Sequence, residues 1–320
     1  MAEVSVSFQQ RKDKKLNNEK DYIQFLTELK ECVEAFFEGK VTGEVCTSLK
    51  NNGVNVTGLL LKGENERVAP NFYLENQYVE WMRGIRTLEE IGNQLCNSYR
   101  EEVEKSRPLL NGIKFEWEEF RRHVFMRLIN KERNADQLES VPYKDFMDLA
   151  IVYYYSITLE DDVQGTLIIS KEHMELLGVT EEELYQAAES NIQRYQPAKI
   201  RCMQDLLYDL GKKVGVEISQ AKECYPYMFV LTNTKGMFGA VSMTCDVELE
   251  CFAKRIGKGF YILPSSVHEV ILVPENKEFC VEYFASIVRE INETQLDPTE
   301  ILSDSIYFYD NETLTLRRVA

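Results

Sequence analysis

The stretch Gly259–Pro274, GFYILPSSVHEVILVP, places four polar side chains between two strongly apolar runs. Side chains of a strand alternate between its two faces, and beyond Glu269 both faces of this stretch are apolar. Such a pattern is typical of a central strand that is covered on both sides. It predicts that His268–Val273 lies in the interior of a mixed or antiparallel sheet. The amphipathic segment Val281–Ile291 is expected to pack on that strand as a helix.

The polar residues of this stretch are the candidate site: Ser265, Ser266, His268 and Glu269. On a regular strand Ser266 and His268 would share a face about 6–7 Å apart, so a serine–histidine pair is one hypothesis. Glu269 would point the opposite way, and the G-x-S-x-G turn of many hydrolases is missing. The alternative, which we favour, is a turn at residues 264–266 whose hydroxyls bond the backbone, with His268 satisfied and half-buried. The catalytic residues, if there are any, stay unknown.

Other motifs do not indicate a metal or a cofactor, and we expect neither. Glu160-Asp161-Asp162 lacks the ligand spacing of a calcium loop and is ordinary for a turn. Gly257-Lys258-Gly259 follows a helix and precedes a strand, the reverse of a phosphate-binding loop. His123 and His173 have no histidine or cysteine nearby at ligand spacing.

Hydrophobic periodicity predicts alternating helices and hairpins along the chain. Helices are expected over residues 21–38, 87–104, 115–131, 180–195, 203–210, 246–256 and 281–291. Strands are expected over residues 42–49, 55–62, 68–74, 148–159, 165–170, 227–233, 239–243, 306–309 and 313–316. Thr87 with Glu90, and Thr180 with Glu183, form capping boxes, and Arg107-Pro108 should end a helix.

The interleaving of these elements shows no regular strand–helix–strand repeat, so the expected fold class is α+β. We expect mixed or antiparallel sheets interleaved with amphipathic helices in two subdomains. Residues 1–20 are expected to be a disordered polar tail. Residues 21–140 form the N-terminal α+β region, and a polar segment before Pro142 marks the boundary. Residues 141–320 form the C-terminal α+β region that contains the LPSSVHEV strand.

Charge and cysteine usage restrict the partners and the compartment. The chain of 320 residues carries a formal net charge of −16, which opposes direct binding to nucleic acid. Its eight cysteines lack paired spacing, and we read no export signal and no membrane-spanning run. We therefore expect a cytoplasmic protein with reduced thiols that does not bind membranes.

Four segments together resemble a known family: Phe146–Tyr154 (FMDLAIVYY), Leu176–Tyr185 (LLGVTEEELY), Tyr261–Pro274 (YILPSSVHEVILVP) and Arg289–Tyr309 (REINETQLDPTEILSDSIYFY). The family is a bacterial domain of unknown function, found chiefly in Gram-positive gut anaerobes. The resemblance runs from about residue 21 to residue 310, and LPSSVHEVI is its most specific part. It implies a bacterial cytosolic protein and supplies no activity, cofactor or catalytic residue.

These observations favour a non-enzymatic binding or regulatory protein, with another protein as a candidate partner. One alternative is a hydrolase-like enzyme that uses Ser266 and His268. A second alternative is an acidic protein that mimics nucleic acid and inhibits DNA-binding proteins. The acidic residues are interspersed with Lys and Arg, as on an ordinary solvated surface, which argues against this alternative.

Overall fold

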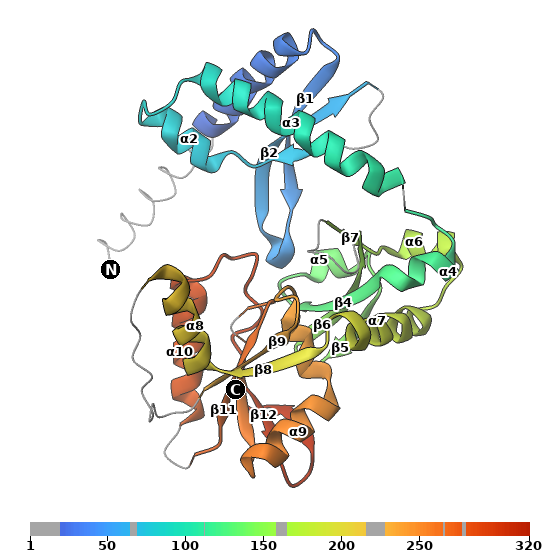
Figure 1. Ribbon diagram of the computed structural model, residues 1–320, viewed down its shortest axis with the longest axis vertical. Coiled ribbons are helices and arrows are strands. Elements are labelled where there is room, and N and C mark those ends of the chain that lie inside the picture. The colour runs from blue at the N-terminus through green and yellow to red at the C-terminus, as the bar shows by residue number, and fades with distance from the viewer. Residues whose placement is uncertain are drawn as a thin grey trace, which may run out of the picture. The chain divides into compact units, whose positions relative to one another are not determined.

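The chain divides into two compact units (Figure 1). The computed structural model describes residues 20–64, 69–111, 113–157, 165–215, 228–264, 266–276 and 280–320. The N-terminal unit comprises Met1–Lys50 and Asn55–Ile113, and the C-terminal unit comprises Asn51–Val54 and Lys114–Ala320. Most of the predicted tail, residues 1–19, lies outside the described residues.

The division lies at Ile113 and Lys114 rather than near Pro142. The reason is a strand pairing that crosses the expected boundary. β4 (Val124–Asn130) pairs antiparallel along its whole length with β6 (Leu149–Ser156). Residues 114–140 therefore belong to the C-terminal unit.

The N-terminal unit packs helices on a small antiparallel sheet. The sheet has the order β1 (Val41–Leu49), β2 (Asn55–Gly63) and β3 (Asn71–Phe72). Its helices cover residues 20–36, α2 (Glu75–Met82) and α3 (Leu88–Asn111). The apolar face of each helix and the strands β1 and β2 contribute to one buried cluster. This agrees with the helices predicted over residues 21–38 and 87–104, whereas α2 was not predicted.

The start of α3 agrees with the sequence, whereas its end does not. Thr87 N–H donates to Glu90 Oε2 over 2.9 Å and Glu90 N–H donates to Thr87 Oγ1 over 3.2 Å, as in a capping box. The prediction that Arg107-Pro108 ends the helix is wrong, because α3 continues to Asn111. A proline removes one backbone donor and bends a helix, but the flanking turns can carry the helix past it.

The first sheet of the C-terminal unit is built around β6, whose eight residues are all buried. β4 pairs with one edge of β6, and β5 (Tyr143–Phe146) and β7 (Thr166–Ile168) pair with the other. The predicted helix over residues 115–131 is wrong. Only α4 (Trp117–Phe120) and the 3-10 turn η2 (Arg121–His123) are helical, and β4 follows. Nearly every β4 side chain is buried, so its apolar run carries no strand alternation that the sequence could show.

The second sheet is antiparallel throughout, with the order β13-β12-β10-β11-β9-β8. Its strands are β8 (Ala198–Cys202), β9 (Phe229–Asn233), β10 (Phe260–Leu263), β11 (Val270–Pro274), β12 (Tyr307–Asp310) and β13 (Thr315–Arg318). β11 lies between β10 and β9, so the interior position predicted for this stretch is confirmed. The strand begins at Val270, and His268 and Glu269 precede it.

Two helices cover opposite faces of this second sheet (Figure 1). Phe260 contacts Phe252 of α9 (Asp246–Ile256) at a ring distance of 5.0 Å. The next residue, Tyr261, contacts Phe284 of α10 (Val281–Thr294) at 5.5 Å. Because neighbouring strand residues point to opposite faces, α9 and α10 lie on opposite sides. The predicted packing of α10 on this sheet is confirmed, since Phe284 is buried in one cluster with β10 and β11.

Of the remaining helices, α5 (Ala135–Leu138) and α6 (Lys171–Leu177) are short and were not predicted, whereas those that begin near Thr180 and Met203 were. α7 (Glu181–Tyr195) begins at the predicted Thr180 capping box. α8 (Met203–Val214) passes the expected stop at Gly211. The predicted strand over residues 239–243 is wrong, because Gly239–Thr244 forms the 3-10 helix η3.

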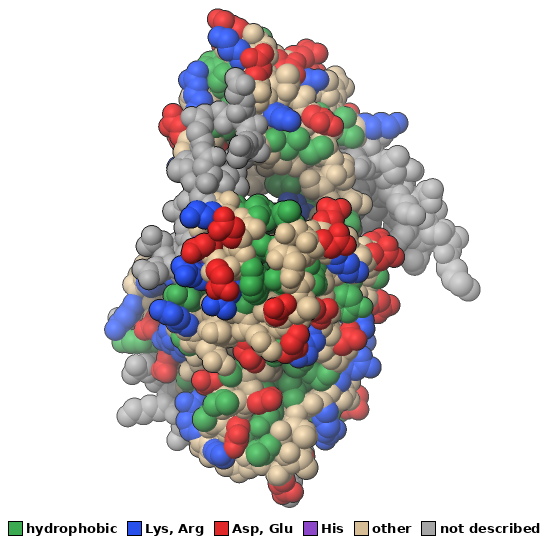
Figure 2. All heavy atoms as spheres, turned by 90° about the vertical axis from the view of Figure 1, so that its right-hand side faces the viewer, with side chains coloured by type: hydrophobic (Ala, Val, Ile, Leu, Met, Phe, Trp, Pro, Cys, Tyr) green, Lys and Arg blue, Asp and Glu red, His purple; other side chains and the backbone are tan. Residues whose placement is uncertain are grey.

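The described helices include none that is long and apolar enough to cross a membrane. The seven cysteines in the described part are free thiols, and Cys224 lies outside it. On the face shown in Figure 2, acidic and basic side chains are interspersed. That face therefore lacks the continuous acidic surface that a nucleic-acid mimic needs.

Candidate functional site

The predicted site folds as a tight turn before β11. Ser266 N–H donates to the Glu269 carbonyl over 3.2 Å, and the Ser266 hydroxyl oxygen accepts the His268 backbone N–H over 3.0 Å. The Ser266 side chain thus caps the backbone of its own turn, as Ser residues commonly do. Glu269 is exposed, and Ser265 lies outside the described residues. The bond from the backbone to the Ser266 hydroxyl oxygen agrees with the interpretation that we favoured, although the turn lies at residues 266–269 rather than at 264–266.

The His268 ring contacts residues from two other segments. Its Nδ1 accepts the backbone N–H of Phe238 over 3.1 Å, and its Nε2 lies 3.8 Å from Glu300 Oε1. The ring also stacks on Phe238 at a centroid distance of 5.6 Å. Since Nδ1 is an acceptor, the proton of the neutral ring resides on Nε2, facing the carboxylate. A carboxylate from another segment therefore faces the ring, whereas the Ser266 hydroxyl faces the backbone.

Phe238 has an unusual backbone conformation for a bulky residue, with φ 52 and ψ 26. Left-handed backbone is disfavoured for such residues and persists only where the surroundings enforce it. The backbone next to Phe238 is closely packed. A Cβ at the neighbouring Gly239 would lie 2.6 Å from the His268 carbonyl oxygen and 2.2 Å from Thr232 Oγ1, so only glycine fits there. The backbone at Gly239 therefore contacts both β9 and the turn that contains His268. The Phe238 ring also contacts Arg127, whose guanidinium carbon lies 4.7 Å from the ring centroid.

The other histidines have local structural partners. His123 Nδ1 lies 2.9 Å from the Ser156 carbonyl oxygen, and its ring stacks on Tyr155. His173 completes a capping box with Ser170 at the start of α6. Among the described residues no group of three His, Cys, Asp or Glu side chains is placed to hold a metal ion. Glu160-Asp161-Asp162 lies outside the described part of the chain.

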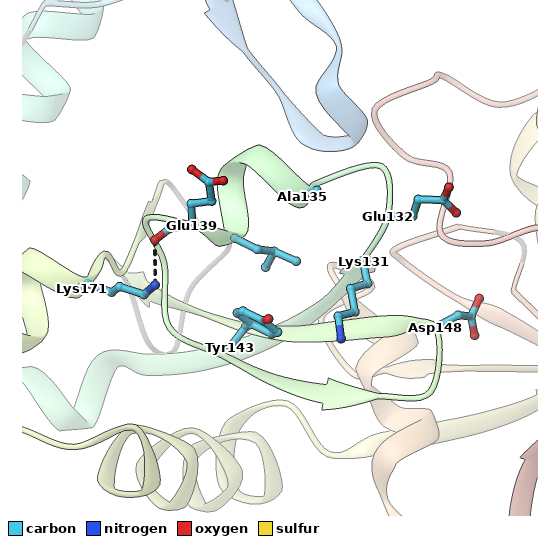
Figure 3. A pocket seen from close by; sticks show the side chains of 8 residues that line it. Lys131, Glu132, Ala135, Glu139, Tyr143, Asp148 and Lys171 are labelled. Atoms are coloured by element: carbon cyan, nitrogen blue, oxygen red, sulfur yellow. Dashed lines mark hydrogen bonds between the residues drawn. The ribbon is translucent and has the colours of Figure 1, made fainter.

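A polar pocket of about 600 Å³ lies beside β5 and α5 (Figure 3). Lys171 and Glu139 lie at one end of it, and Glu132 and Asp148 lie at the other. Lys171 Nζ donates to the Glu139 carbonyl over 2.7 Å, the contact drawn in Figure 3. Lys131 Nζ pairs with Asp145 over 2.5 Å, and this contact raises the pKa of the lysine.

The carboxylate of Asp148, which lines this pocket, accepts hydrogen bonds from three hydroxyl groups. Ser303 and Ser305 donate to its Oδ2 over 2.8 and 2.9 Å, and Tyr307 donates to its Oδ1 over 2.8 Å. Burial and the nearby Asp148 charge raise the pKa of Tyr307, which keeps the phenol protonated as a donor. These groups fasten the segment before β12 to the β5–β6 turn. A ligand in the polar pocket would therefore compete with bonds that Asp148 and both lysines already make.

An apolar cavity of about 430 Å³ lies between α10 and the face formed by β10 and β11. Its described walls come from α8, α10 and the second sheet: Met203, Met228, Leu263, Ile271, Val273, Tyr283, Phe284, Ile287, Val288, Ile291 and Asn292. These side chains are apolar except for the hydroxyl of Tyr283 and the amide of Asn292. Such a composition, with few polar groups, is typical of ligand cavities.

Asn292 is the polar anchor of this cavity and is only 3% exposed. Its Nδ2 donates to the Ser303 carbonyl over 3.0 Å and to Asp304 Oδ1 over 2.7 Å, which fixes the amide plane. Its Oδ1 is buried and has no hydrogen-bond partner among the described residues. Asn292 is thus a cavity-lining residue whose amide nitrogen is bonded and whose amide oxygen is buried and unpaired among the described residues.

Sequence reasoning placed several wall residues in a helix packed on a strand, but it did not identify the cavity or the Arg127–Phe238 contact. Asn292 follows Val288 by four residues and so falls on the apolar stripe of α10, where a polar residue is a detectable signal. Phe238 precedes a glycine between two strands, which gives only a turn signal. Arg127 stood within a segment assigned to the wrong element.

Comparison with models of protein families assigns this chain to a family. The chain matches the model of a family of unknown function, DUF5688, over residues 22–311. A search of curated proteins found no match, and a search of solved structures found none. The matched range covers most of both units and includes Arg127, Phe238, Ser266, His268 and Asn292.

Proposed function

This chain belongs to the family of unknown function DUF5688, and we propose that it is a binding protein that holds a small apolar molecule in the apolar cavity. The observation that carries the proposal is the cavity's wall, which is almost wholly apolar around a space of about 430 Å³. Ligand cavities typically measure about 300–1,000 Å³. Burying apolar ligand surface contributes roughly 25 cal/mol per Å² before the costs of association.

Asn292 defines the polar part of the ligand. A buried acceptor without a partner costs about 1–3 kcal/mol, and a ligand that donates a hydrogen bond to Asn292 Oδ1 would recover that cost. The ligand class is therefore an apolar body with one donor, such as a hydroxyl, an amide N–H or a protonated acid. A pure hydrocarbon would contact the apolar wall but leave Asn292 Oδ1 without a hydrogen-bond partner.

The sequence supports a further part of the proposal, namely that the protein acts in the bacterial cytosol. Eight cysteines without paired spacing fit a reducing compartment. A hydrolase based on Ser266 and His268 has less support. The Ser266 hydroxyl oxygen accepts the His268 backbone N–H, and the contacts described for the His268 ring are with Phe238 and Glu300 rather than with this hydroxyl.

The test compares a medium-chain alcohol, 1-decanol, with the alkane decane in binding and thermal-unfolding measurements. We expect 1-decanol to raise the unfolding midpoint and decane to raise it less. Ile287→Trp fills the cavity with a larger ring and should abolish both effects. Glu290→Trp is the matched control, because Glu290 is an exposed residue of the same helix that is not part of the described wall. The proposal fails if neither compound binds the wild type, or if Ile287→Trp binds as the wild type does.

A further inference from the structure

Arg127 is a half-buried cation in the middle of β4, opposite Val152 of β6. Its guanidinium lies over the Phe238 ring. Within the described residues it makes neither an ion pair nor a hydrogen bond, and its Nε is buried without a partner. A guanidinium carries five N–H donors and no acceptor, so this arrangement leaves its donors unused.

The described groups that interact with Arg127 are the aromatic side chains of Phe238 and Tyr154 rather than carboxylates. Tyr154 packs edge-on against Phe238 at 5.3 Å, and its hydroxyl lies 3.4 Å from Gln196 Oε1. Burial lowers the pKa of Arg127, which reflects how far water has been removed from the charge. Desolvated cations in proteins are normally paired, because an unpaired one is strongly unfavourable.

We propose that Arg127 is the anchor of an anion-binding site that takes an oxyanion, the carboxylate or phosphate group of a small molecule. The planar guanidinium fork matches both groups. Since part of the Arg127 side chain stays accessible while Nε is buried, the anion would approach the terminal amino groups.

Phe238 supports this assignment because it is held in a strained conformation at the contact. Its φ of 52 is maintained by the bond to His268 Nδ1 and by the close packing of Gly239. Strained backbone that the surroundings enforce is found preferentially at binding and catalytic sites. Here it places an aromatic face against the cation, which orients the guanidinium before a ligand arrives.

The anion site is independent of the proposed apolar ligand. None of the described residues in the cavity wall is Arg127, Tyr154 or Phe238. The two proposals can therefore fail separately, and the experiments below leave the cavity unchanged.

The test measures thermal unfolding of the full chain in sodium phosphate, sodium acetate and sodium chloride at equal ionic strength. An anion at about ten times its Kd should raise the midpoint by roughly 3–6 °C over chloride. Phosphate alone, acetate alone or both can give the rise, and the pattern identifies the group. Arg127→Met should abolish the rise, and Arg127→Lys, which keeps the charge without the fork, should reduce it.

Arg201→Met is the matched control, because Arg201 is already paired with Asp209. This variant should keep the full rise of the wild type. The proposal is overturned if neither oxyanion raises the wild-type midpoint over chloride, or if Arg127→Met keeps the rise. Should Arg127→Met fail to fold, an undiminished rise in Arg127→Lys overturns it equally.

Discussion

The backbone N–H of Phe238 donates to Nδ1 of His268 over 3.1 Å, and the two rings stack. This pair joins the segment after β9 to the turn before β11. The Thr232 hydroxyl strengthens the junction by donating to the His268 carbonyl over 2.8 Å. His268 thus stabilises the strained backbone of Phe238 through one acceptor atom and one ring face.

We expect His268→Ala to destabilise the protein by about 1–3 kcal/mol, because the Phe238 N–H loses its acceptor. His268→Asn should retain much of that stability, since its side-chain oxygen can take the place of Nδ1. Urea unfolding followed by circular dichroism measures both variants. Equal stability of His268→Ala and wild type would show that the bond contributes nothing.

Gly239 should tolerate no side chain. The Cβ of Gly239→Ala would lie 2.6 Å from the Asn233 nitrogen and 2.6 Å from the His268 carbonyl oxygen, both of which are backbone atoms. We expect a loss of about 3 kcal/mol or more, in the range of overpacked sites. Gly236→Ala is the control, because Gly236 has a φ of +68 but open space around it, and should cost only about 1 kcal/mol. A smaller loss at Gly239 than at Gly236 would contradict the packing seen here.

Much of the fold could be predicted from local signals. The capping box of Thr180 predicted the start of α7, and the glycine after Ile256 predicted the end of α9. Both signals act through the adjacent backbone. The interior position of β11 followed from apolar side chains on both faces. β4 could not be predicted this way, since a run buried on both faces lacks the period that separates strand from helix.

The site depends on long-range contacts that a sequence does not display. Arg127 and Phe238 are far apart in the chain and meet only because β4 lies near the start of η3. Ser266 and His268 were correctly singled out as polar residues in an apolar setting. The Ser266 bonds stay within its own turn, whereas the His268 ring contacts Phe238 and Glu300, which belong to other segments.

Phe284 should be a major contributor to the stability of the C-terminal unit. It is 6% exposed and contacts Tyr261 beneath α10. We expect Phe284→Ala to cost roughly 3–5 kcal/mol in the free energy of unfolding. Tyr283→Ala, at a neighbouring position that is 62% exposed, should cost far less. A Phe284→Ala variant with the unfolding midpoint of the wild type would contradict the assignment of Phe284 to the core.

Asp148→Asn should weaken the attachment of the segment before β12. The carboxylate accepts three hydroxyl bonds through two oxygens, whereas an asparagine amide offers one oxygen and adds two donors. We expect a loss of about 2–4 kcal/mol, because Tyr307 or the serines lose their acceptor. Lys171→Met lies in the same pocket and loses a single exposed bond to a carbonyl, so it serves as the control. If Asp148→Asn and Lys171→Met had equal stability, the conclusion that Asp148 attaches the segment before β12 would be contradicted.

Tyr154 should make stability fall at alkaline pH. Burial raises the pKa of Tyr154 to about 12 from its ordinary value of 10.0, although the Gln196 hydrogen bond and the Arg127 charge act in the opposite direction. Between these values the unfolded chain releases the proton while the folded chain retains it. The stabilising contribution is therefore complete below about pH 10 and is lost as pH rises through the folded pKa.

Tyr154→Phe removes this ionisation and should flatten the decline by roughly 2–3 kcal/mol over that interval. The comparison uses the change in unfolding free energy with pH for each protein, because the substitution also removes the bond to Gln196. Arg127→Met should extend the decline to higher pH, since it removes a charge that lowers the phenol's pKa. Parallel stability curves for wild type and Tyr154→Phe between about pH 10 and 12 would show that the phenol is not desolvated as the structure indicates.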